Sequence, residues 1–146
     1  MKSRCSSSFE KLAQNGVRRD RFLAWHGGAR RTLCAYENPT YATGVLGALY
    51  GQAPPLVNAA RPPEHWETYD IVYHPLVCDS GGNVTKKGTV TVLLNGVLVQ
   101  DHVTIRNTSG GCEAAALMLQ DHSGFKGAPV TTLRFRNIWY RPLEPE

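Results

Sequence analysis

The segment GTVTVLLNGVLVQDHVTI, residues 88–105, constrains the fold of this 146-residue chain more than any other. Two β-branched and aliphatic runs flank Asn95-Gly96, the pair that best tolerates the positive φ angles of a type I′ turn. Residues 88–105 are therefore expected to form an antiparallel hairpin. This hairpin is the first indication that the body of the chain is a β structure.

Three further segments have the alternation of β-strands. ETYDIVYHP, residues 67–75, places Tyr69, Ile71 and Tyr73 on one face and stops at a proline. AALMLQDH (115–122) and TLRFRNIWYRPL (132–143) supply two more strands. CDSGGNVTKKG (78–88) is expected to be a turn-rich loop, and residues 48–66 hold too much Pro and Gly for a helix or a central strand. Several short strands with almost no helical pattern predict an all-β sandwich of the jelly-roll kind.

The first 35 residues differ from the rest of the chain in charge and in pattern. They carry a net charge of +6, whereas residues 36–146 carry −2, so the overall charge of +4 comes from this head. SSSFEKLAQNG, residues 6–16, could start a short helix, whereas residues 17–35 show neither a helical nor a strand period. We expect two regions: an irregular or short-helical basic head over 1–35 and a β domain over 36–146.

Several classes of protein do not fit this sequence. The head has no recognisable nucleic-acid motif and no aromatic stacking platform, which argues against nucleic-acid binding. No span has the length of a transmembrane helix, and no apolar core of a signal peptide is visible. The four cysteines have no CxxC spacing, so a zinc site is not indicated, and free thiols are the expected state.

Period-2 spacing predicts one polar face on the last two strands. In a strand, residues two apart share a face. The leucines at 117 and 119 then point away from Gln120 and His122. In the last strand, Leu133, Phe135 and Trp139 are expected on the core side. Tyr69 of the earlier strand and Trp66, at the end of the loop before it, are expected in the core as well. The predicted surface comprises Gln120, His122, Arg134, Arg136 and Tyr140.

Such a surface offers directional donors and an apolar ring, which suits a polyhydroxylated or anionic small ligand. The alternative interpretation is that both arginines are merely solvated. Outside this surface, Asp121 is expected to bond loop amides, and Gln100 to His102 and His65 are expected at solvated positions.

The body of the chain also resembles a known family. YENPTYATGVLGALYGQAPPLVNAARPPEHWETYDIVYH, KGTVTVLLNGVLVQDHV, LMLQDH and LRFRNIWYRPL are similar, in this order, to the second half of the 3-keto-disaccharide hydrolase domain family. This resemblance implies a concanavalin-like jelly roll, which is expected to be incomplete here because the basic head replaces the family's first strands. A truncated gene or a reading-frame change upstream of Tyr36 would produce that replacement. Members are often exported by bacteria, which suggests a periplasmic or secreted protein.

The resemblance implies chemistry on glycosides that carry a ketone at C3. The ketone acidifies the C2 proton, so a general base can form an enolate that expels the oxygen at C1. His122 is expected to act as the base or acid and Arg136 to bind the enolate oxygen. The expected substrate-binding residues are Gln120, Arg134, Tyr140, Glu37, Gln52 and Asn58, of which the last two could instead order their loop.

Other readings stay open at this point. No cofactor is required, although a divalent metal on His122 and a carboxylate is compatible with the residues. The head alteration could leave the domain inactive, and exposed sheet edges could support a homo-oligomer. The main alternative function is a non-catalytic carbohydrate-binding module.

Overall fold

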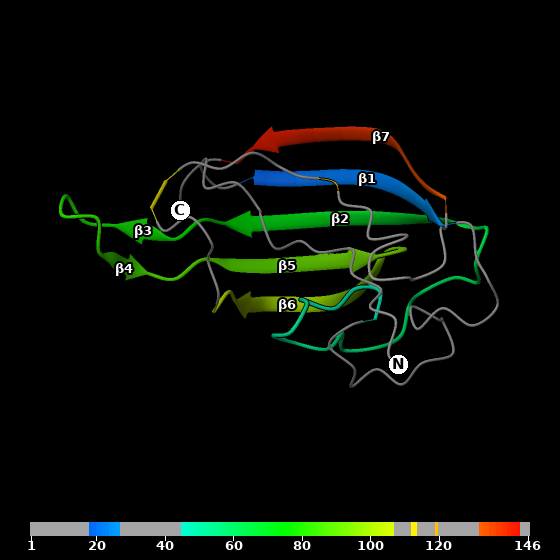
Figure 1. The fold of residues 1–146 in the computed structure, drawn as a ribbon, viewed down its shortest axis with the longest axis horizontal. Coiled ribbons are helices and arrows are strands. Elements are labelled where there is room, and N and C mark those ends of the chain that lie inside the picture. Colours follow the sequence, from blue (N-terminus) through cyan, green and yellow to red (C-terminus); the bar gives the residue numbers. More distant parts are fainter. Residues whose placement is uncertain (1–17, 27–44, 107–111, 114–118, 120–131, 144–146) are drawn as a thin grey trace.

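The computed structural model describes residues 18–26, 45–106, 112–113, 119 and 132–143. The regular secondary structure in these residues consists of strands: β1 Arg18–His26, β2 Trp66–His74, β3 Val77–Cys78, β4 Val84–Lys86, β5 Thr89–Leu94, β6 Val97–Thr104 and β7 Leu133–Pro142. Five of them form a sheet in the order β6-β5-β2-β1-β7, and β3 pairs with β4 (Figure 1). Every pair is antiparallel, which confirms the prediction of an all-β fold.

The hairpin and strand β2 form as the sequence predicts. Asn95 and Gly96 join β5 to β6 with φ angles of 55° and 80°, the left-handed conformations that a type I′ turn requires. Strand β2 alternates buried and half-buried residues along its whole length. The side chains of Tyr69, Ile71 and Tyr73 are buried, as expected.

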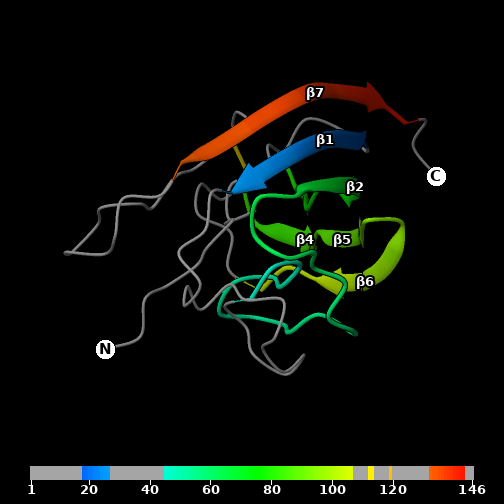
Figure 2. The same ribbon diagram turned by 90° about the vertical axis from the view of Figure 1, so that its right-hand side faces the viewer.

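The core lies on one face of the five-stranded sheet. Residues 45–60 contain no helix or strand longer than a single bridge, and they cover the core with Leu46 and Leu49. Figure 2 shows this segment running on one side of the sheet and around β6. The core cluster comprises Leu46, Leu49, Tyr69, Ile71, Tyr73, Val90, Val92, Leu94 and Val99. The predicted long ordered loop over 48–66 is therefore confirmed, and its order comes from packing on the sheet.

Gln100 fastens this covering segment to the sheet. The register between β6 and β5 shifts on both sides of Val92, so the adjacent residues Val99 and Gln100 of β6 both turn toward the core. The Nε2 atom of Gln100 donates hydrogen bonds to the carbonyl oxygens of Gly47 at 2.8 Å and Pro54 at 3.1 Å. The expectation that Gln100 is solvated is therefore wrong, because the bulge rotates its side chain inward.

The expectation of irregular structure throughout residues 17–35 is also wrong. Residues 18–26 form β1, which pairs with β2 from Arg18↔Tyr73 to Trp25↔Trp66 and with β7 on its other side. Long-range pairing with two strands imposes this conformation on a segment that has no strand period of its own. The division of the chain into a head and a body at residue 36 stays a prediction. In the part of the chain that the structure describes, no helix is long and apolar enough to span a membrane.

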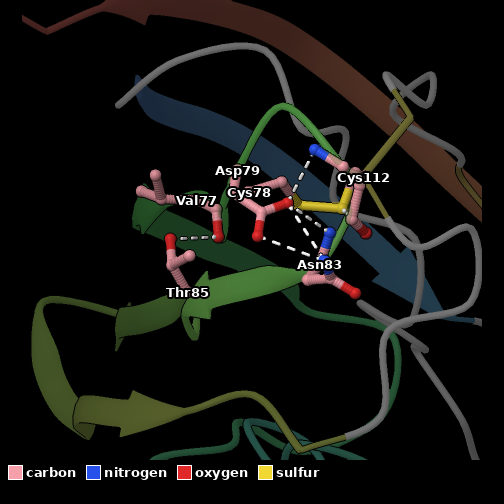
Figure 3. The surroundings of a disulfide bond; sticks show 8 residues. Val77, Cys78, Asp79, Asn83, Thr85 and Cys112 are labelled. Atoms are coloured by element: carbon pink, nitrogen blue, oxygen red, sulfur yellow. Dashed lines mark hydrogen bonds between the residues drawn. A yellow bond between two sulfur atoms is a disulfide. The ribbon is translucent and has the colours of Figure 1, made fainter.

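A disulfide joins Cys78 to Cys112, with their Cα atoms 6.1 Å apart (Figure 3). The expected free thiols are thus wrong for these two cysteines, whereas Cys5 and Cys34 lie outside the described residues. Cys78 belongs to the two-stranded β3–β4 sheet, within the segment expected to be only a turn-rich loop. The carboxylate of Asp79 accepts hydrogen bonds from the backbone N–H groups of Gly81 and Asn83, which forms the tight turn between these strands.

Candidate functional site

Strand β7 changes the facing of its side chains at Asn137. Leu23 of β1 pairs with Arg136, but Arg21, two residues away, pairs with Trp139, three residues away. One extra residue is therefore inserted in β7, and Asn137 has a φ angle of 54° there. Residues beyond the bulge lie on the face opposite to the one that simple alternation assigns.

The bulge corrects two predicted positions. Trp139 lies on the face that holds Arg134 and Arg136 and is 43% exposed, so its expected core position is wrong. Tyr140 is in register with Asp20, which pairs with the core residue Ile71, so it lies on the core side of the sheet instead of beside the arginines. Arg134 and Arg136 share a face, as predicted. Because of the bulge, the indole of Trp139 and not the phenol of Tyr140 lies on the face that holds the two arginines.

The sheet face opposite the core is called the polar face below. Arg134 is in register, through Trp25, with Trp66, and Arg136 is in register, through Leu23, with Thr68. Both arginines therefore lie on the side of β2 that faces away from its buried tyrosines. The polar face comprises Trp66, Thr68, Asp70, Val72 and His74 of β2, Thr89, Thr91 and Leu93 of β5, and Arg134, Arg136 and Trp139 of β7.

Arg136 reaches across β1 to stack on Trp66. Its Cζ atom lies 3.8 Å from the centroid of the indole ring, which is a cation–π contact. Strands β7 and β2 are both neighbours of β1, so the long arginine side chain spans the strand between them. A guanidinium that stacks through its flat face keeps its N–H groups in its own plane, above the indole, where they can donate to a carbonyl or an anionic oxygen.

A group of hydrogen bonds fixes the backbone on either side of Trp66. Arg61 donates from Nη1 to the carbonyl oxygen of Trp66 at 3.1 Å. The next residue, Glu67, is buried and accepts hydrogen bonds from the backbone N–H of Arg61 at 2.7 Å and from the side-chain amide of Asn95. Burial raises the pKa of Glu67, and the hydrogen bonds from Asn95 and Arg61 oppose that rise without cancelling it.

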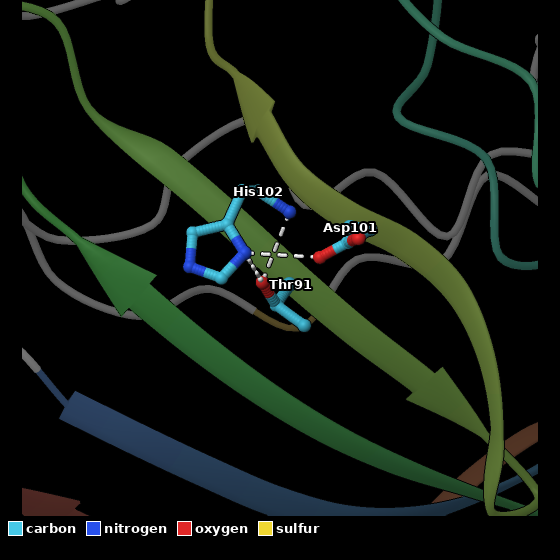
Figure 4. A network of polar contacts seen from close by, with 3 residues as sticks. All are labelled: Thr91, Asp101 and His102. Atoms are coloured by element: carbon cyan, nitrogen blue, oxygen red, sulfur yellow. Dashed lines mark hydrogen bonds and ion pairs between the residues drawn. The ribbon is translucent and has the colours of Figure 1, made fainter.

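A second polar cluster lies at the other end of the face (Figure 4). His102 contacts Oδ1 of Asp101 at 2.9 Å and Oγ1 of Thr91 at 3.5 Å, in both cases through Nδ1. The Thr91 hydroxyl also accepts a hydrogen bond from the backbone N–H of His102 at 3.1 Å. The ring of His74 stacks on His102 with centroids 6.2 Å apart. Because both side-chain oxygens approach the same nitrogen, the arrangement is not that of a Ser-His-Asp triad, in which the two ring nitrogens have different partners.

The two clusters are too far apart to act on one sugar ring. The guanidinium of Arg136 lies over Trp66 and the ring of His102 stacks on His74, at the two ends of β2. Positions 66 and 74 are eight residues apart, which corresponds to about 26 Å along a strand. Among the described residues, no group of three or more His, Cys, Asp or Glu side chains could hold a metal ion.

The predicted site residues fall into three groups. Arg134 and Arg136 lie together on the polar face. Gln52 and Asn58 belong to the segment that covers the core side, where Gln52 accepts from the N–H of Arg106 at 2.7 Å and Asn58 from that of Ala60 at 3.2 Å. The structure therefore does not bring these two residues together with the arginines. His122, Gln120 and Glu37 lie outside the described residues, and so does Asp121.

The expected core position of Trp66 is wrong, because Trp66 lies on the polar face opposite the buried tyrosines. Sequence reasoning also missed the contacts of His102 with Thr91 and His74 of that face. The alternation of ETYDIVYH, extended one residue toward the N-terminus, places Trp66 opposite the buried tyrosines, so this signal was present in the sequence. No comparable signal exists for His102, because its position depends on a bulge with a φ angle of 45°. His65 is exposed, as expected, and its Nδ1 lies 3.1 Å from the carbonyl oxygen of Pro63.

The fold is that of a known class of sandwich proteins. A protein of Parabacteroides distasonis described as a "putative glycosyl hydrolase" superimposes on the chain with a TM-score of 0.64 and 28% sequence identity. The match covers 91% of this chain and 66% of that chain, so the present chain spans a little less than two thirds of its neighbour. The predicted jelly-roll β-sandwich class is confirmed by this likeness and by the antiparallel sheet. No curated protein matches the chain.

The family model of the 3-keto-alpha-glucoside-1,2-lyase-like domain matches residues 24–141. The chain belongs to this family, as its resemblance to 3-keto-disaccharide hydrolase domains predicted. The match begins within β1, before Tyr36, the first residue of the quoted family motifs. The names of the family and of the neighbour both refer to glycosides.

Proposed function

We propose that the chain acts on glycosides oxidised to a ketone at C3, by removal of the C2 proton and elimination of the oxygen at C1. The observation that supports this best is the position of Arg136 on the polar face of a sheet in a 3-keto-alpha-glucoside-1,2-lyase-like domain. A cationic donor held in a fixed direction stabilises the negative charge that develops on an enolate oxygen.

The proposed reaction has two stages. A general base takes the proton from C2, and the electron pair of that C–H bond forms the C2–C3 double bond of an enolate whose charge rests on the C3 oxygen. The enolate then collapses, the C1–O bond breaks, and a proton donor supplies the leaving oxygen. Addition of water to the resulting double bond, with hydroxyl at C1 and a proton at C2, completes net hydrolysis.

The residues have the following proposed roles. Arg136 donates hydrogen bonds to the C3 oxygen as it gains charge, and Arg134 binds a neighbouring hydroxyl group. His122 acts as the base at C2, because an imidazole titrates near neutral pH, and Gln120 positions the sugar. Tyr140 is not included, because it lies on the opposite side of the sheet from both arginines.

The site of action is proposed to be an oxidising compartment outside the bacterial cytoplasm. The disulfide between Cys78 and Cys112 supports this location, since such bonds persist in secreted and periplasmic proteins and are rare in the cytosol. The export of many family members is in agreement with it.

The test is release of the aglycone from a 3-keto-glucoside by the purified chain in deuterated water. We expect turnover with one solvent deuterium at C2 of the sugar product, and a loss of about a hundredfold or more in His122→Ala. His65→Ala is the matched control, because His65 is an exposed loop histidine. Turnover without deuterium at C2 would exclude elimination, and equal turnover in His122→Ala would exclude its role as base.

The second candidate is a non-catalytic carbohydrate-binding module, which the stacked indole and guanidinium groups of the polar face would also serve. Such a module binds the glycoside without releasing the aglycone. Its affinity would be nearly unchanged in His122→Ala and reduced in Arg136→Gln, as measured by titration calorimetry.

A further inference from the structure

We propose that Trp66 is a positioning residue, which orients the guanidinium of Arg136 toward the C3 oxygen of the substrate. This inference rests on the proposed function and adds to it a residue that acts through another side chain. The geometric basis is the 3.8 Å distance between the Cζ atom of Arg136 and the centroid of the Trp66 ring.

Arg136 needs such support because of where it stands. It is exposed and lies on β7, which pairs on one side with β1 and, among the described strands, has no partner on its other side. An exposed arginine has many side-chain rotamers, and the entropy of fixing one of them opposes binding of an oxygen in a defined direction. Stacking on an indole selects a small set of these rotamers while the in-plane N–H groups stay available.

Trp66 is itself held in a way that suits this role. Its side chain is half-buried, and its carbonyl oxygen accepts a hydrogen bond from Nη1 of Arg61. The neighbouring Glu67 is buried on the core side and binds the backbone of Arg61 and the side chain of Asn95. The indole therefore stands on backbone that is anchored from the other side of the sheet.

A purely structural role for the same contact would be to fasten β7 to β2 across β1. The two roles predict different results. A fastener contributes to folding stability whatever substrate is present, whereas a positioning residue affects the step in which charge develops on the C3 oxygen. An interaction made only in that step lowers kcat and leaves KM nearly unchanged when it is removed.

The experiment is a double-mutant cycle of Trp66→Leu and Arg136→Gln, with kcat and KM for a 3-keto-glucoside and the thermal midpoint measured for each form. We expect Trp66→Leu to lower kcat about tenfold in the wild-type background and to have no further effect when Arg136 is already glutamine. Trp66→Phe keeps an aromatic face and should stay within about threefold of wild type. If Trp66→Leu does not fold, Trp66→Met takes its place in the cycle.

The outcomes separate this inference from the proposed function. Equal losses from Trp66→Leu in both backgrounds would overturn the positioning role while leaving the activity intact. A loss in Trp66→Phe as large as in Trp66→Leu would overturn it as well. Absence of turnover in the folded wild-type chain would instead overturn the proposed function, and the positioning role with it.

Discussion

The side-chain amide of Asn95 donates a hydrogen bond to the carboxyl group of Glu67 and a second one to the carbonyl oxygen of Ala59, at 2.8 Å. The residue that makes the β5–β6 turn thereby also ties that turn to the start of β2 and to the covering segment. The Oδ1 atom of Asn95 accepts from the backbone N–H of Thr68 at 3.0 Å, which fixes the orientation of its amide.

Because both oxygens of Glu67 accept hydrogen bonds, Glu67→Gln should destabilise the fold. The new Nε2 donor would face another donor, either the backbone N–H of Arg61 or the side-chain NH₂ of Asn95. The amide of Asn95 cannot flip to present its oxygen without losing its hydrogen bonds to Thr68 and Ala59. We expect a loss of about 1–3 kcal/mol in the free energy of unfolding, measured in urea. The exposed Glu113→Gln is the control, and an unchanged stability in Glu67→Gln would contradict the hydrogen-bond assignment.

Burial of Glu67 also predicts a dependence of stability on pH. Because burial raises its pKa above the ordinary value of 4.5, the folded chain binds the proton more tightly than the unfolded chain. The stabilisation from this tighter proton binding is fully present at pH values below the unfolded-state pKa of Glu67. It is lost as the pH rises through the folded-state pKa. The stability difference between wild type and Glu67→Gln should therefore shrink as the pH rises from 4.5 through the raised folded-state pKa, as unfolding curves at each pH would show. A difference that grows with pH would mean that the pKa is lowered instead.

Replacing Gln100 should loosen the segment that covers the core. Gln100→Met keeps the volume of the side chain but leaves the carbonyl oxygens of Gly47 and Pro54 without this donor. We expect a loss of about 2–3 kcal/mol and faster proteolysis within residues 45–60. Asp101→Asn, at the adjacent 60%-exposed position, should change neither quantity. Equal proteolysis of both variants would show that Gln100 does not hold the segment.

Loss of the Cys78–Cys112 disulfide should lower stability by about 3–4 kcal/mol, because the bond closes a loop with a sequence separation of 34. Cys78→Ser, Cys112→Ser and the double variant should therefore have the same urea midpoint. Peptide mapping by mass spectrometry should find the Cys78 peptide linked to the Cys112 peptide, and the two should separate on reduction. Recovery of these two peptides unlinked from the unreduced protein would refute the bond.

Gly88 lies where two backbone segments approach closely, so Gly88→Ala should be unfavourable. A Cβ atom there would lie 2.8 Å from the carbonyl oxygen of His74 and 3.1 Å from the N atom of Leu76. We expect a cost of about 1–3 kcal/mol in unfolding free energy, since backbone atoms must move. Gly81→Ala is the matched control, because its closest neighbours are side-chain atoms of Asn83 and Asp79. Equal stabilities of the two variants would rule out the close approach.

Local patterns in the sequence were sufficient for much of this fold. The Asn95-Gly96 turn, the alternation along β2 and the Pro-rich covering segment each depend on residues close together in the chain, and each forms as predicted. The position of Arg134 and Arg136 on the same face of β7 follows from the same period of two. The quoted family motifs likewise led to the family to which the chain belongs.

Only the tertiary structure decided the features that depend on distant partners. The bulge at Asn137 is defined by the pairing of β7 with β1, and it alone exchanges Tyr140 for Trp139 beside the arginines. The hydrogen bond of the buried Gln100 to Gly47 likewise joins separate parts of the chain, and so does the Cys78–Cys112 disulfide. A repeat of two residues predicts a side chain's face only while the register holds, and one inserted residue reverses every face beyond it. For this reason the sequence predicted a face with two arginines, whereas the tertiary structure decided that one of them, Arg136, stacks on Trp66.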